Sequence, residues 1–80
     1  MEGSAQSLWE RCLPIIRNNV DEKQYRTWFE PIQIISFEKQ VLTFGLPSQY
    51  FYEFLSEHFG RLIFSVVRRV FGEGTQLKYS

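Results

Sequence analysis

The segment VLTFGLPSQYFYEFLSEHF, residues 41–59, contains both kinds of secondary structure that the whole chain is expected to combine. Residues Val41–Leu46 are rich in β-branched and aromatic side chains, which predicts a strand. Pro47 stops that strand, and Ser48 is placed to cap a helix, because its hydroxyl can accept a hydrogen bond from a free amide of the first turn. Helical spacing then puts these apolar residues in one inward-facing arc: Phe51, Leu55, Phe59, Leu62, Val66 and Val70.

Two aromatic residues at the start of this predicted helix lie outside the apolar arc. Tyr50 and Phe54 are one helical turn apart, on the side that also carries Glu57, Arg61 and Arg68. Exposed aromatic side chains beside charges are typical of protein interfaces, so both residues are candidate anchors for a partner. The alternative is that they are buried against the neighbouring strands.

The second half of the predicted helix is apolar on almost every side. This pattern indicates either that the helix bends at Gly60 or that its end is enclosed between layers, and it comes from Ile63, Phe64, Val67 and Phe71. Glycines end the helix at positions 72 and 74, and residues 75–79 can form a third strand.

Upstream of residue 41, the chain predicts a partner strand and a short helix. Residues Ile32–Phe37 form the first half of a hairpin with Val41–Leu46. The break in alternation at Ile34 and Ile35 leaves the register of this strand open, and a bulge could resolve the conflict. Asp21 is the expected N-cap of a helix that must end at about residue 30, just before a proline. The aromatic residues of that helix are Tyr25, Trp28 and Phe29, and Trp28 and the proline, Pro31, are interpreted as structural.

The first helix is expected to start at Ser7, which forms a capping-box spacing with Glu10. Pro14 lies inside it, and we expect a kink with the helix surviving. The apolar arc spans ~160°, wider than the ~100° that a core-facing helix needs. The flank carrying Trp9 and Leu13 therefore either remains outside as an adhesive surface or caps the core. The arc comprises Leu8, Trp9, Cys12, Leu13, Ile15, Ile16 and Val20.

These elements predict a single α+β domain in the order α-α-β-β-α-β. Helices should pack on one face of a three-stranded sheet, because each helix must bury its apolar stripe. A chain of 80 residues has room for one such domain, and the polar residues 1–6 are expected to be flexible.

Composition limits the function. The formal net charge is zero, so nothing drives the chain as a whole toward a polyanion or a membrane surface. The last twenty residues are more basic, and these four side chains could contact single-stranded nucleic acid weakly: Arg61, Arg68, Arg69 and Lys78. There is no apolar targeting segment and one cysteine only, which indicates a reducing, cytoplasmic location.

No catalytic arrangement is visible in the sequence. His58 is the single histidine, and Cys12 is set among apolar residues as a buried structural thiol would be. Neither a metal-ligand cluster nor a phosphate-binding glycine motif is present, so we expect no cofactor and no enzymatic activity.

Four motifs resemble the N-terminal domain of the bacterial replication initiator DnaA. They are Leu8-Trp9-x-x-Cys12-Leu13, Tyr25-x-x-Trp28-Phe29-x-Pro31, Leu42-x-Phe44-x-x-Pro47-Ser48-Gln49-Tyr50 and Gln76-Leu77-Lys78-Tyr79. The resemblance implies a fold related to the K-homology (KH) domain. It also implies that the full protein is nucleoid-associated and continues beyond residue 80 into an ATPase domain and a helix-turn-helix DNA-binding domain, neither of which is present here.

The resemblance further implies that this domain self-associates, helps to load the replicative helicase DnaB and binds initiation regulators. It matches Trp9 to self-association, and Tyr50 and the position of Gln24 to partner binding. From the helical wheel we add Leu8 and Leu13 to the self-association flank and Phe54 to the partner site, which also includes Glu22. Gln24 is neutral at a position that is acidic in the best-known relatives, and Glu22 could substitute for it. The alternative function is a weak single-strand-binding KH-like module, although the chain lacks the GXXG loop with which KH domains grip the backbone.

Overall fold

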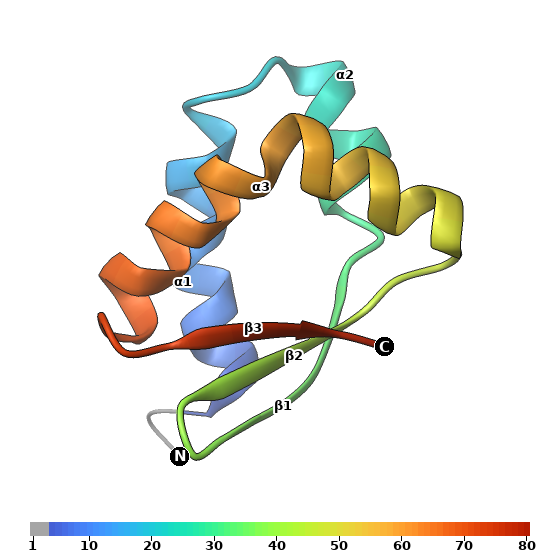
Figure 1. Cartoon of the computed structure of the whole chain (residues 1–80). Helices are drawn as coiled ribbons and strands as arrows, with labels where there is room; N and C mark the ends of the chain where they lie inside the picture. The colour runs from blue at the N-terminus through green and yellow to red at the C-terminus, as the bar shows by residue number, and fades with distance from the viewer. Residues whose placement is uncertain (1–3) are drawn as a thin grey trace.

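The computed structural model describes residues 4–80 and confirms the expected order of elements (Figure 1). The elements are α1 (Ala5–Arg17), α2 (Glu22–Gln24), the π-helical turn η1 (Tyr25–Phe29), β1 (Gln33–Glu38), β2 (Val41–Gly45), α3 (Gln49–Phe71) and β3 (Gln76–Tyr79). α1 includes residues 5 and 6 and so overlaps the stretch 1–6 that was expected to be flexible. Residues 1–3 of that stretch lie outside the described part of the chain.

A side chain caps the start of each of the helices α1, α2 and α3, and two of these three caps are the predicted ones. Asp21 and Ser48 accept hydrogen bonds from the third residue beyond each of them, at 2.8 and 3.1 Å. The expected cap at Ser7 is wrong: Ser4 caps α1, and its hydroxyl accepts from the Ser7 amide at 3.1 Å. α1 continues through Pro14, which leaves one carbonyl of the preceding turn without its helical donor.

The sheet is mixed, with strand order β1-β2-β3. β1 and β2 form the predicted antiparallel hairpin, whereas β3 lies parallel to β2. A bulge resolves the break in alternation, because the register passes from Ile34 opposite Phe44 directly to Ser36 opposite Thr43. The skipped residue, Ile35, is 57% exposed.

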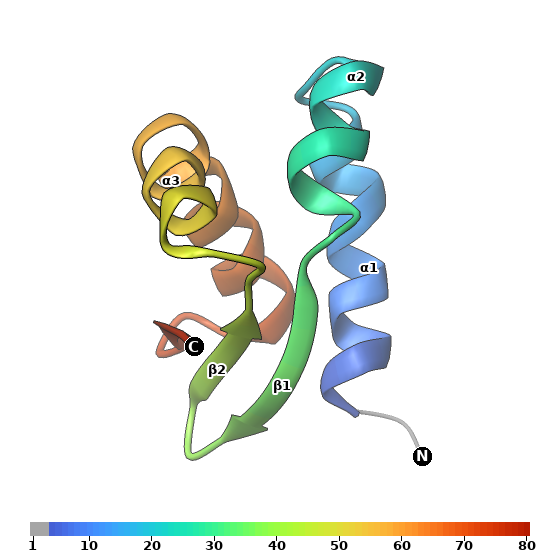
Figure 2. The same ribbon diagram turned by 90° about the vertical axis from the view of Figure 1, so that its right-hand side faces the viewer.

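Gly45 leaves room for the side chain of the bulged residue. A Cβ built on Gly45 would lie 2.9 Å from the Cδ1 atom of Ile35, so the bulged side chain occupies the room that the missing methyl leaves. Figure 2 shows α1 running alongside β1, on the side of the molecule opposite to α3.

The helices pack against one apolar face of the sheet. Leu42 and Phe44 of β2 are fully buried there, and Ile34, Leu77 and Tyr79 pack beside them from the flanking strands. The buried core comes from α1, η1, β2 and α3, together with one residue just before β1, and it consists of Trp9, Cys12, Ile16, Tyr25, Phe29, Ile32, Leu42, Phe44, Leu55, Phe59, Ile63, Val66 and Val67. The predicted fold class, α+β with helices packed on a three-stranded sheet, is confirmed.

α3 continues without interruption through Gly60, and Figure 1 shows that it changes direction about midway along its length. Its second half is not enclosed on every side, because Phe64 is 44% exposed while Ile63 and Val67 are buried. Within residues 4–80, none of the helices combines the length and the apolar character needed to cross a bilayer.

Candidate functional site

Tyr50 is the most exposed large hydrophobic side chain among residues 4–80. It lies in the first turn of α3, directly after the Ser48 cap and the preceding proline, and 69% of its surface is open to solvent. The next two turns carry Glu53 and Glu57, both exposed. The prediction of an outward aromatic residue beside charges is therefore confirmed for Tyr50.

Phe54 behaves differently from Tyr50, and here the sequence prediction needs correction. Phe54 is half-buried and stacks on Trp28 of η1, with ring centroids 3.9 Å apart and an angle of 9° between the planes. Trp28 also contacts Phe51 at 5.0 Å, and His58 covers the Phe54 ring at 4.2 Å. The helical wheel of α3 could not show this contact, because the covering ring belongs to another element.

Glu22 and Gln24 lie on α2, whereas Tyr50 lies on α3. Both are exposed, but the Glu22 carboxylate already accepts hydrogen bonds from Arg17 and Arg26, each at 3.0 Å. The hydrogen bond from Arg17 is the main reason that the pKa of Glu22 lies below its ordinary value. A partner would have to displace these guanidinium groups, so Glu22 is a weak substitute for an acidic residue at position 24.

The first-helix flank splits into a buried and a partly open portion. Trp9 is only 2% exposed and packs edge-on against Phe44 of β2, with ring centroids 5.2 Å apart. The structure thus favours core capping over the exposed flank, so the Trp9 side chain offers no surface to a second copy in this fold. Leu8 and Leu13 are half-buried and remain reachable.

The four basic residues do not form one cluster. Arg68 and Arg69 line a hollow on the second half of α3 together with Phe64, and Arg61 lies exposed one turn before it. Arg68 places its guanidinium 5.1 Å from the centre of the Phe64 ring. Lys78 lies elsewhere, on β3.

Sequence reasoning missed Phe64 as a surface residue, although its spacing of four from Arg68 could have indicated the contact between ring and guanidinium.

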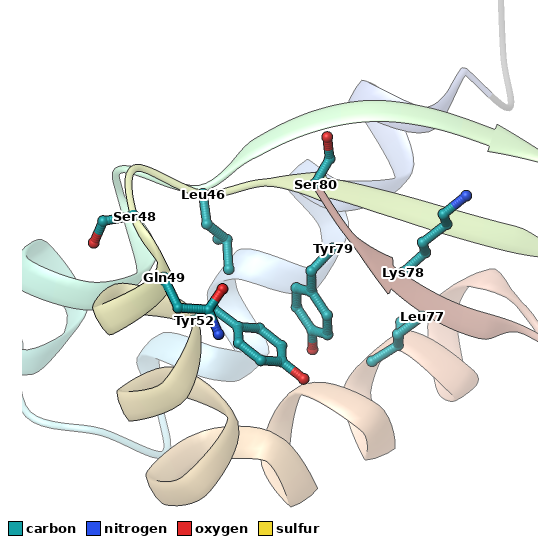
Figure 3. Close-up of a pocket in the computed structure, with 8 residues that line it drawn as sticks. All are labelled: Leu46, Ser48, Gln49, Tyr52, Leu77, Lys78, Tyr79 and Ser80. Carbon is teal, nitrogen blue, oxygen red and sulfur yellow. The ribbon is translucent and has the colours of Figure 1, made fainter.

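A cavity of about 550 Å³ lies between the start of α3 and β3 (Figure 3). Figure 3 shows the Tyr52 and Tyr79 rings side by side within it, with Leu46 above them; the two ring centroids are 4.9 Å apart. Burial raises the pKa of Tyr79, and the neighbouring Tyr52 raises it further. Residue patterns along the chain could not reveal this cavity, because it requires β3 to lie beside α3.

Cys12 is a core residue with no exposed surface. Burial raises the pKa of its thiol from the ordinary 9.0 to about 12, and the Arg11 guanidinium opposes that change only slightly. A thiol that holds its proton is a poor nucleophile and a poor metal ligand. Its prediction as a buried structural thiol is confirmed.

The Cys12 thiol makes stability depend on alkaline pH. The folded state keeps the proton up to about pH 12, whereas the unfolded chain releases it near pH 9, so rising pH favours unfolding between these values. The free energy of unfolding should fall by about 1.4 kcal/mol on reaching roughly pH 10 through this group alone. Urea denaturation of wild type and Cys12→Ala measures it, because the variant should lack this component; equal slopes with pH would contradict the assignment.

Comparisons with known proteins show which proteins this chain is similar to. A family model described as the DnaA N-terminal domain matches residues 6–69. The chromosomal replication initiator protein DnaA of Bacteroides fragilis is 47% identical over 79 residues, which cover 99% of this chain and 17% of that protein. The corresponding protein of Bacteroides thetaiotaomicron is 42% identical over 80 residues, covering 100% and 17%.

A more distant relative agrees. The chromosomal replication initiator protein DnaA of Flavobacterium psychrophilum is 37% identical over 79 residues, which cover 99% of this chain and 16% of that protein. The chain therefore spans less than a fifth of the length of these relatives, and the similarity extends over nearly all of it.

Proposed function

The chain belongs to the DnaA N-terminal domain family, and from this premise we propose that it is the interaction module of a replication initiator. In this proposal it recruits the replicative helicase DnaB and initiation regulators to the chromosomal origin, and it associates weakly with other copies of itself. The ATPase and duplex-binding functions belong to other domains of a longer, cytoplasmic, nucleoid-associated protein.

One observation carries the proposal: Tyr50 exposes 69% of its surface although the small core has used nearly every other large side chain. Leaving a tyrosine in water forgoes burial energy, and such exposed aromatic anchors are typical of binding hot spots. The neighbouring Glu53 and Glu57 give this part of α3 an acidic border, which favours a partner with basic side chains. We name Tyr50, Glu53 and Glu57 the α3 N-terminal patch.

The α3 C-terminal half supplies a matched control for testing the patch. Phe64 is also an exposed aromatic residue of α3, 44% open to solvent, but it lies among arginines. Truncation of a hot-spot aromatic costs about 2 kcal/mol, so Tyr50→Ala should weaken binding to purified DnaB about thirtyfold in calorimetry. Phe64→Ala should leave the affinity unchanged. Equal affinities for wild type and Tyr50→Ala, with both folded, would contradict the assignment of the patch.

Self-association is proposed to use Leu8 and Leu13, the half-buried residues of the α1 flank. Leu8→Glu adds a charge at a position that is not part of the core, so the variant should fold normally and sediment as a monomer at concentrations where wild type associates. Identical sedimentation of the two proteins would remove α1 from the interface.

The second candidate function is weak binding of single-stranded nucleic acid, and the Phe64–Arg68 contact favours it. Sites that bind single strands usually combine an aromatic ring, on which a base stacks, with positively charged groups that bind the phosphates. The residues are Arg61, Phe64, Arg68 and Arg69, with Lys78 removed because it lies on β3. Fluorescence titration with oligothymidine at two salt concentrations tests it: Phe64→Ala should abolish salt-dependent binding that Tyr50→Ala retains.

A further inference from the structure

β3 is an edge strand of the sheet, with one edge free. β3 pairs with β2 on one side only, and the amides of Gln76 and Ser80 donate to carbonyls on that side at 2.8 and 2.9 Å. Alternate residues of a strand direct their backbone groups to opposite edges, so Leu77 and Tyr79 turn their N–H and C=O groups outward. Within residues 4–80 no other strand pairs with that edge.

The 550 Å³ cavity runs along this edge, a size in the usual range of binding pockets, and it contacts both faces of β3. Leu77 and Tyr79 lie on the apolar face of the sheet, whereas Lys78 lies on the opposite face. On the far side, Tyr52 of α3 and Leu46 form an apolar wall (Figure 3). An exposed strand edge with a groove between it and a helix has the geometry for adding a strand from another chain.

We propose that the β3 edge binds an extended segment of a partner protein with the pattern apolar–acidic–apolar, which adds a fourth strand antiparallel to β3. The two apolar residues lie opposite Leu77 and Tyr79, point into the groove and exchange backbone hydrogen bonds with them. The acidic residue between them lies opposite Lys78 on the other face. This surface shares no residue with the α3 N-terminal patch, although Gln49 of the cavity donates a hydrogen bond to Glu53 of the patch. The inference does not depend on the proposed function.

The charge of Lys78 indicates which kind of segment binds at the β3 edge. Eight of the described residues line the cavity, and Lys78 is the one among them with a charged side chain, so this side chain presents a positive charge to a ligand. A second copy of the domain fits poorly, because antiparallel pairing of two β3 strands through Leu77 and Tyr79 sets Lys78 directly opposite its counterpart. Like charges at such positions destabilise a strand pair, whereas opposite charges stabilise it.

Titration of the isotope-labelled domain with short peptides, followed by the backbone amide resonances, tests the proposal. The capped peptide Ser-Val-Glu-Val-Ser should shift the amides of Leu77 and Tyr79 most, with Tyr52 moving beside them. Its counterpart Ser-Val-Lys-Val-Ser should bind about threefold more weakly or worse, since attraction is replaced by repulsion. A third peptide with N-methylated valines cannot donate to the strand edge and should not bind.

Charge reversal supplies the matched variant. Lys78 is exposed, so Lys78→Glu should fold like wild type and should prefer the lysine peptide over the glutamate peptide. Three outcomes would overturn the proposal: equal affinity for all three peptides, shifts confined to residues away from β3, or concentration-dependent shifts of the β3 amides without peptide, which would make a second copy the occupant. Tyr50→Ala should leave the titration unchanged, so this test fails or succeeds separately from the DnaB measurement.

Discussion

Trp9→Ala is expected to lower the free energy of unfolding by about 3–5 kcal/mol, the usual cost of removing a buried aromatic side chain from a core. Trp9 is 2% exposed and its ring packs edge-on against Phe44. A domain of 80 residues has a total stability of roughly 4–12 kcal/mol, so the variant should lose a large fraction of it. Thermal unfolding followed by circular dichroism should show a midpoint about 15 °C lower or more.

The same substitution bears on self-association. If Trp9→Ala fails to associate, partial unfolding alone could be the cause. Leu8→Ala supplies the control for stability, because Leu8 lies beside Trp9 but outside the buried core. We expect Leu8→Ala to keep nearly the full wild-type stability. A thermal midpoint for Trp9→Ala within a few degrees of wild type would contradict the burial of this side chain.

Trp28→Ala should have the second-largest effect, about 2–3 kcal/mol, since its side chain is half-buried and its ring holds η1 against α3. The indole stacks on Phe54 at 3.9 Å and also contacts Phe51 at 5.0 Å. Such aromatic pairs contribute about 0.5–1.5 kcal/mol beyond the burial of their area. A double-mutant cycle with Phe54→Ala, measured by urea denaturation, should therefore give a coupling free energy in that range.

Variants at the start of α3 also distinguish residues that stabilise the fold from residues that bind a partner. Phe54→Ala should weaken partner binding only as far as it loosens the fold. Tyr50→Ala should weaken binding at unchanged stability, because Tyr50 is exposed and is not part of the core cluster. Additive stability losses in the cycle, with no coupling, would show that the stacked rings do not hold the two elements together.

Local signals predicted the elements well. The strand-to-helix segment, the Ser48 and Asp21 caps and the bulge at Ile35 each depend on residues close together in the chain, and each was found. The misplaced start of α1 is also local: Ser4 and Ser7 both have capping chemistry, and the hydroxyl of Ser4 captures the Ser7 amide one turn earlier than expected.

Long-range contacts decided what the sequence could not. The apolar arc on α1 is so wide that the sequence could not decide whether Trp9 lies on the surface or in the core. Only its contact with Phe44 of β2 shows that it lies in the core. Phe54 lies off the apolar stripe of α3, yet Trp28 covers it from η1. The cavity beside β3 depends on a strand pairing that no periodicity reveals. Tyr50 lies outside the same stripe of α3 and is 69% exposed, so for this residue the helical wheel alone gave the right prediction.

The parallel pairing of β3 with β2 also determines when this domain can finish folding during translation. β1 and β2 are neighbours along the chain and can pair while the ribosome is still making α3. Leu42 and Leu77, by contrast, lie opposite each other but are separated by the entire third helix. Pairs so distant raise the contact order and slow folding, because the intervening loop must be closed first. A nascent chain that has not yet released β3 from the ribosome exit tunnel therefore exposes the β2 edge, and the sheet is completed as one of the last steps in the synthesis of this domain.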